Sequence, residues 1–214
     1  MHSAPLRFAI LHDDAKFKHW QSRCVEELVA LPEVRAQLLI TLQTTTPALP
    51  RVLIGVAQIL LPRPADSDDE LQADSAALAR LKRCDLDFVL SFVDMACSPE
   101  FMDAPRYGVW RFQFGDWTRY RGGPAGFWEV YDGESVSGAL LIRVLHTRDS
   151  VLVLRDGYFR TDLLSYARNQ AKMLACVTRW PSQVCVDIRN GTIGRFSENG
   201  VRGAAPVESS PEGT

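Results

Sequence analysis

The chain has 214 residues, of which 46% are hydrophobic and 23% are charged, so it can bury one substantial core and fits a single globular domain. Its net charge of -2 at pH 7 argues against nonspecific binding to phosphate backbones, which needs clustered excess Lys and Arg. Nucleic acid is therefore not the expected partner.

The 5 cysteines are scattered, without a CxxC pair or a Cys/His cluster at zinc-ligand spacing. This pattern favours reduced thiols and predicts a cytoplasmic protein without a metal site. The N-terminal residues lack a long apolar segment, and the longest apolar run, over residues 52–61, is interrupted by Gly55 and Gln58. The sequence therefore indicates neither a signal peptide nor a membrane span.

The apolar pattern predicts alternating strands and helices from the N-terminus onward. Residues 6–11 form a short apolar run, which is typical of a strand, and apolar positions then recur at helical spacing over residues 20–31. The next apolar runs cover residues 36–42 and 52–61. The second of these runs fits either a strand or a short buried helix.

The alternation continues through the middle of the chain. After a polar loop over residues 63–69, apolar spacing predicts a helix that ends near Cys84. Residues 88–93 are rich in aromatic and β-branched side chains and predict a buried strand. The runs over residues 140–145 and 151–154 indicate paired strands joined by a short connection.

The last predicted elements are a helix over residues 162–179 and a short strand over residues 184–188. The C-terminal residues are rich in Gly, Pro, Glu and Ser, which predicts a flexible tail. We therefore expect a domain over residues 1–190 and a tail over residues 191–214. The alternation predicts an α/β fold of three layers, with a mostly parallel sheet covered on both faces and a C-terminal hairpin.

The stretch over residues 107–138 reads YGVWRFQFGDWTRYRGGPAGFWEVYDGESVSG. A strand carrying Arg111 and Gln113 leads to a Tyr-Arg-Gly sequence, a helix candidate, a Gly turn and a Ser-Gly pair. From residue 6 to about residue 188, the order of elements resembles the formyltransferase family, which includes glycinamide ribonucleotide formyltransferase and the N-terminal domain of methionyl-tRNA formyltransferase. In that family the strand carries Asn-x-His, and a later strand reads Thr-Gly-Val-Thr. The resemblance implies a Rossmann-like fold.

The resemblance also implies a set of catalytic positions. In the family the Asn amide binds the formyl oxygen, the His handles a proton, and a loop Asp orients the His. Here Arg111 takes the Asn position, Gln113 takes the His position, and Asp149 falls at the loop Asp, without the Gly that follows it in the family. Arg and Gln can hold an oxygen but cannot act as a general base near neutral pH. His146 is either a relocated base or an exposed histidine at a strand end.

Further residues are candidates for substrate binding. Seven side chains in or next to this stretch form either an aromatic and cationic pocket or the packing of a loop against the sheet: Arg106, Trp110, Trp117, Arg119, Tyr120, Arg121 and Trp128. Within it, Trp117, Tyr120, Arg121 and Gly122 are the expected substrate-binding residues. Asp13, in the turn after the first predicted strand, either receives a cationic amine or caps the following helix.

Three functions are compatible with these observations, because a fold does not determine a reaction. The first is a biosynthetic enzyme that transfers a formyl or related one-carbon or acyl group to an amine of a small molecule, with 10-formyltetrahydrofolate as the donor that the resemblance implies. The second uses the same cleft without folate for condensation, acyl transfer or hydrolysis. The third is a noncatalytic interaction domain. The sequence leaves open a protein partner or a homodimer.

Overall fold

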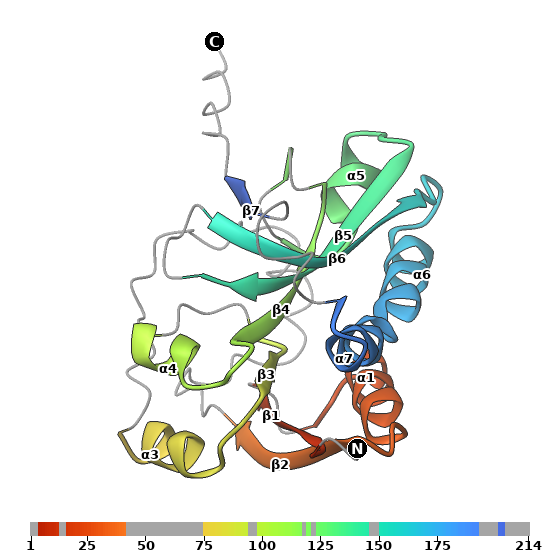
Figure 1. The fold of residues 1–214 in the computed structure, drawn as a ribbon. Helices are drawn as coiled ribbons and strands as arrows, with labels where there is room; N and C mark the ends of the chain where they lie inside the picture. Colours follow the sequence, from red (N-terminus) through yellow and green to blue (C-terminus); the bar gives the residue numbers. More distant parts are fainter. Residues whose placement is uncertain are drawn as a thin grey trace.

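The computed structural model describes residues 4–12, 16–41, 75–93, 98–116, 119–120, 123–145, 150–192 and 201–203. Its strands form one sheet in the order β2-β1-β3-β4-β5-β6-β7 (Figure 1). The strands are β1 (Leu6–His12), β2 (Val34–Thr41), β3 (Phe88–Ser91), β4 (Val109–Phe114), β5 (Val136–Val144), β6 (Ser150–Arg160) and β7 (Val201–Gly203). The helices are α1 (His19–Val29), α3 (Ser75–Arg83), α4 (Pro99–Asp103), α5 (Phe127–Tyr131), α6 (Tyr166–Val177) and α7 (Trp180–Arg189).

Strand direction confirms the predicted sheet. The strands β1, β2, β3 and β4 are parallel, whereas β5 is antiparallel to β4 and β6 is antiparallel to β5. Strand β6 therefore runs in the same direction as β4, and only β5 and the short β7 run the other way. The sheet is mostly parallel, and β5 and β6 form the expected hairpin.

Helices cover both faces of the sheet, as predicted. Helices α1, α6 and α7 lie together on one face, and α3 and α4 lie on the other (Figure 1). Because side chains alternate along a strand, β4 contributes to both cores. Trp110 and Phe112 pack in the core beneath α1, α6 and α7, whereas Val109 packs in the core beneath α3 and α4.

Most of the predicted elements are present. The strands expected over residues 6–11 and 88–93 are β1 and β3, and the helix expected over residues 162–179 is α6. The paired strands β5 and β6 are both longer than their apolar runs indicated. The ambiguous run over residues 52–61 lies outside the described residues. Strand β7 falls within the segment expected to be a tail, and it pairs with β6 at the edge of the sheet.

The strand predicted over residues 184–188 is wrong, because these residues belong to helix α7. A short apolar run fits a buried helix as well as a strand. The deciding signals are Pro181, which is favoured in the first turn of a helix, and the spacing of the buried side chains. Among the buried side chains of α7, those of Pro181, Val184, Cys185 and Ile188 recur at helical rather than alternating intervals.

A buried polar network joins α5, β5 and α6. The side chain of Asn169 is 0% exposed, and its amide nitrogen donates to the backbone oxygen of Gly126 at 3.2 Å and to the hydroxyl of Ser137 at 3.0 Å. Its amide oxygen accepts from the backbone nitrogen of Asp162 at 3.0 Å. Gly126 has φ 68° and contacts this amide, so a side chain at position 126 would collide with it. Asn169 therefore fixes the start of α5 against the sheet.

Replacement of Asn169 by Ala is expected to lower the free energy of unfolding by about 1–3 kcal/mol, because buried backbone groups lose their partners. Urea unfolding followed by circular dichroism measures this loss. Asn190→Ala is the matched control, because Asn190 is exposed at the end of α7. Equal stability of the Asn169→Ala and Asn190→Ala variants would contradict a structural role for the network.

Candidate functional site

The candidate site lies where the parallel strands end. Because β1, β2, β3 and β4 are parallel, their carboxyl ends meet at one edge of the sheet, which is where ligands bind in open α/β folds. Arg111 pairs with Ser91, the last residue of β3, and Gln113 lies two residues further along β4. They are separated by one residue, so they point to the same face, which is the face covered by α3 and α4. The structure thus brings these two predicted residues together.

An apolar wall stands beside Arg111 and Gln113. On β5, Ile142 lies opposite Arg111 and Leu140 lies opposite Gln113. Both apolar side chains are buried and pack with Val153 of β6, while Arg111 and Gln113 are each partly buried. A cation and an amide beside buried apolar groups interact more strongly with a bound oxygen than they would in water.

The two histidines that the structure describes do not share this face. His12 ends β1 and is 4% exposed, and its ring lies 4.6 Å from that of Phe17 on the α1 side of the sheet. Strand β1 thus extends one residue beyond the apolar run 6–11 that predicted it. His19 is exposed at the start of α1. The described part of this face therefore holds a cation and an amide without an imidazole.

Tyr120 is the predicted substrate-binding residue that the structure describes. Its hydroxyl donates to the carboxylate of Asp132 at 2.6 Å. Burial and this carboxylate raise the pKa of Tyr120 to about 12, so the phenol stays protonated at neutral pH. Arg119, beside it, forms an ion pair with Glu134. Both side chains tie their loop to the end of α5.

Six other predicted site residues lie outside the described residues: Asp149, His146, Trp117, Arg121, Gly122 and Asp13. Of the wider aromatic and cationic set, Trp110 is 0% exposed and stacks on Phe88 in the core, so it is not a pocket residue. Arg106 is exposed and lies over the ring of Tyr107, with 5.1 Å between the guanidinium carbon and the ring centroid.

The structure adds Glu129, which the sequence analysis did not single out. This α5 residue is 1% exposed, and its carboxylate accepts from the backbone nitrogens of Asp116 and Gly138, at 3.2 Å and 3.3 Å. A single Glu within the apolar sequence FWEVY resembles a surface position of a short helix. The signal that could have identified it is the pair of glycines, Gly115 and Gly138, which lets two chain segments approach closely.

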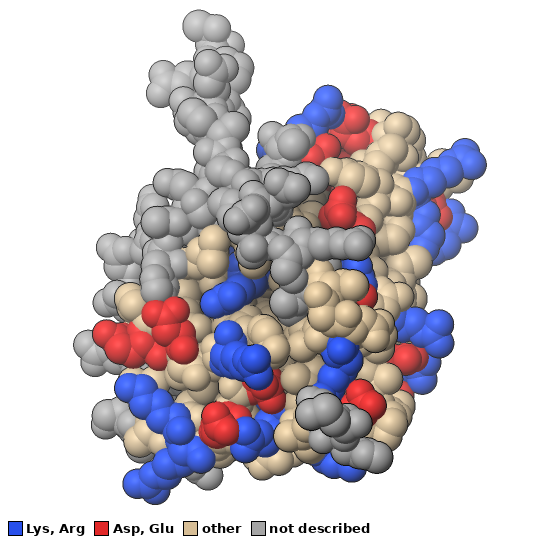
Figure 2. Space-filling model, in the orientation of Figure 1, with Lys and Arg blue, Asp and Glu red and all other residues tan. Residues whose placement is uncertain are grey.

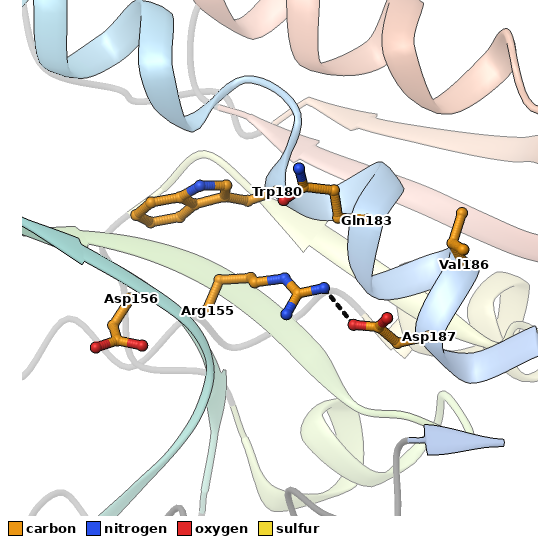
Figure 3. A pocket seen from close by; sticks show the side chains of 6 residues that line it. All are labelled: Arg155, Asp156, Trp180, Gln183, Val186 and Asp187. Carbon is orange, nitrogen blue, oxygen red and sulfur yellow. Dashed lines mark hydrogen bonds and ion pairs between the residues drawn. The ribbon is translucent and has the colours of Figure 1, made fainter. Parts of the chain in front are cut away.

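A pocket of about 500 Å³ lies on the opposite face of the sheet, between β6 and α7 (Figure 3). It is lined by Arg155, Asp156, Trp180, Gln183, Val186 and Asp187. Within it, Arg155 of β6 and Asp187 of α7 form an ion pair. This pair joins the helix to the sheet and is separate from Arg111 and Gln113.

The described surface shows no broad region of one charge in the view of Figure 2, where Lys and Arg alternate with Asp and Glu. Each helix in the described ranges is too short or too polar to cross a membrane. Among the same residues, His, Cys, Asp and Glu side chains do not gather in groups of three that could hold a metal ion. Burial raises the pKa of both Cys24 and Cys185 to about 12, so both thiols stay protonated near neutral pH.

No family model matches the sequence, and no curated protein matches it either. Solved structures do match. Glycinamide ribonucleotide transformylase 1 from Symbiobacterium toebii aligns with a TM-score of 0.64 and 15% identity, over 94% of this chain and 95% of that chain. A formyltetrahydrofolate deformylase from Pseudomonas syringae pv. tomato aligns with a TM-score of 0.63 and 13% identity, over 95% of this chain and 67% of that chain.

A variant of HypX from Aquifex aeolicus is also similar, with a TM-score of 0.59 and 16% identity. The alignment covers 88% of this chain but only 27% of HypX, so this chain matches one part of the longer HypX protein. At these identities the likeness establishes the architecture and leaves the reaction open. The resemblance in residues 107–138 is thus confirmed at the level of architecture, and the protein has the formyltransferase fold.

Proposed function

We propose that the protein transfers a formyl or related one-carbon or acyl group to an amine of a small molecule. The observation that carries this proposal is the placement of Arg111 and Gln113 on one face of β4, where the neighbouring strand β3 ends at Ser91. Several solved structures with this fold are named for formyl transfer or for formyltetrahydrofolate. 10-Formyltetrahydrofolate is therefore the proposed donor, and it would supply the formyl group.

In this proposal Arg111 and Gln113 hold the carbonyl oxygen of the donor. As the amine attacks the carbonyl carbon, charge develops on that oxygen, and a fixed guanidinium and amide stabilise it without reorganising. A new carbon–nitrogen bond forms to the acceptor and the bond to the donor breaks. One proton leaves the acceptor amine and one is gained by the departing group. Asp149 and His146 are the proposed residues for this proton transfer.

The hydrogen-bonding groups of Arg111 and Gln113 are better suited to binding a formyl oxygen than to acid–base chemistry. Arg111 carries a permanent positive charge and offers several N–H donors, and Gln113 offers an amide. Ile142 and Leu140 keep water from one side of both groups. An electrostatic site of this kind acts best on a substrate that is already a good nucleophile, so an unprotonated amine is the expected acceptor.

The proposal is tested with 10-formyltetrahydrofolate and a panel of small primary amines, by following tetrahydrofolate release and formylated product. Isothermal titration with folate analogues measures donor binding separately. Formylated amine with saturable donor binding supports the proposal. No heat with any folate, together with no formylated product, rejects it. Formate released without an acceptor would instead favour hydrolysis at the same site.

A further inference from the structure

We propose that Glu129 is a positioning residue for the Gln113 end of the candidate site. Its carboxylate accepts from the backbone nitrogen of Asp116, three residues after Gln113, where the chain has left β4. This inference rests on the proposed function only for its kinetic consequence, because the structural part can be measured without turnover.

The hydrogen-bond ladder between β4 and β5 ends at Glu129. Gln113 pairs with Leu140 and Phe114 pairs with Ala139. One residue further, the backbone nitrogen of Gly115 donates to the oxygen of Gly138 at 2.9 Å. The nitrogens of Asp116 and Gly138 then donate to Glu129 Oε1 instead of to the facing strand. One side-chain oxygen thus replaces the acceptors that the ladder no longer provides.

The two strands meet very closely at this point. A methyl group added at Gly138 would lie 3.0 Å from the oxygen of Gly115 and 3.2 Å from the α-carbon of Asp116. Gly115 has φ 107°, a conformation that side chains rarely tolerate. Without side chains at these two positions, the backbone itself is the only spacer. Glu129 joins the two segments at this close approach, because its Oε1 accepts from a backbone nitrogen of each.

A buried carboxylate supplies a hydrogen-bond acceptor only at a cost in desolvation free energy. A charge that is 1% exposed costs several kcal/mol of desolvation unless hydrogen bonds offset it. The two bonds it accepts are also long for bonds to a carboxylate. The carboxylate provides one contact that joins α5, β5 and Asp116, the second residue after β4. A site that holds an oxygen needs this, because small displacements of a donor weaken it sharply.

The same segment is held again further along. The backbone nitrogens of Arg119 and Tyr120 donate to the oxygen of Asp116, at 2.9 Å and 2.6 Å. Asp116 is therefore the link between β4 and the loop that carries Tyr120. Displacing it moves the Gln113 side and the Tyr120 side of the site together.

The test compares Glu129→Ala and Glu129→Gln in the full chain. Amide hydrogen exchange is measured by NMR at Asp116 and Gly138, together with the side-chain amide resonance of Gln113. In Glu129→Ala both backbone amides are expected to exchange about 10- to 100-fold faster, and the Gln113 resonance is expected to shift. Gln keeps the acceptor oxygen, so Glu129→Gln should restore slow exchange and the native resonance.

Kinetics extend the test to the proposed reaction. Glu129→Ala is expected to lower kcat about 10- to 100-fold with a smaller change in KM, and Glu129→Gln should recover most of the loss. Glu134→Gln is the matched control, because Glu134 pairs with Arg119 at the outer part of the same loop. It should leave the amides of Asp116 and Gly138 unchanged.

Three outcomes overturn the inference: slow exchange and an unshifted Gln113 resonance in Glu129→Ala, a Glu129→Gln variant as altered as Glu129→Ala, or an equal effect of Glu134→Gln. If Glu129→Ala does not fold, Gly138→Ala replaces it, because its methyl group presses on the same junction. An unshifted Gln113 resonance in that variant also overturns the inference. A native protein without transfer activity rejects the proposed function, while the exchange data still decide the role of Glu129.

Discussion

Replacement of Arg111 by Ala is expected to lower kcat for formyl transfer by a factor of about 10²–10³ while the protein stays folded, since this is the usual cost of losing a donor to a developing oxyanion. Arg111 is partly buried beside Ile142, where its charge acts in a less polar environment than water. Steady-state kinetics with donor and amine measure the loss, and circular dichroism checks the fold.

Two further variants make this prediction specific. Arg111→Lys keeps the charge but loses the planar fork of donors, so it should recover only part of the rate. Arg106→Ala is the control, because Arg106 is exposed and contacts the ring of Tyr107. Turnover of Arg111→Ala within about twofold of the native rate, where an oxyanion donor should contribute about a hundredfold, would remove Arg111 from the site.

The relative placement of Arg111 and Gln113 follows from the sequence because side chains alternate along a strand. Arg111 and Gln113 are separated by one residue, so they share a face wherever that strand lies. The same rule places Trp110 on the other face, where it is buried. The sequence left Trp110 either in a pocket or packed against the sheet, and its position along the strand decides for packing.

The errors share another physical origin. The run 184–188 was assigned by its β-branched and apolar residues, although Pro181 and the spacing of buried positions favour the helix α7. The first strand was predicted to end with its apolar run at residue 11, although pairing with β2 extends β1 through His12. In both cases the neighbouring elements, and not local preference, determine the structure.

Glu129 could not be derived in the same way. Its role depends on the close approach of the chain after β4 to β5, at Gly115 and Gly138. Both glycines lie outside helix α5, which carries Glu129. Helix periodicity describes which face of α5 is buried but not which buried polar group meets a backbone donor. Contacts of this kind depend on the register of two strands and the position of a helix, which no local pattern encodes.

Replacement of Trp110 by Ala is expected to lower the free energy of unfolding by about 3–5 kcal/mol, the range for removing a large aromatic side chain from a core. Trp110 is 0% exposed, and its ring stacks on that of Phe88 with centroids 3.9 Å apart. Phe88 stacks in turn on Phe8, so three strands share one column of rings. Domains of this kind are stable by only about 5–15 kcal/mol, so the loss is a large part of the total.

The variant Trp110→Phe separates the ring column from the indole hydrogen bond. Phe retains most of the contact with Phe88 but loses the bond from the indole nitrogen to the oxygen of Tyr107, at 3.0 Å. It should therefore cost less than Trp110→Ala, while Trp128→Ala, at a partly exposed position on α5, should cost least. Urea unfolding monitored by circular dichroism gives all three values. A Trp110→Ala variant no less stable than Trp128→Ala would mean that the stacked rings do not hold β3 and β4 together. Other contacts would then have to fix the position of β4, which carries Arg111 and Gln113.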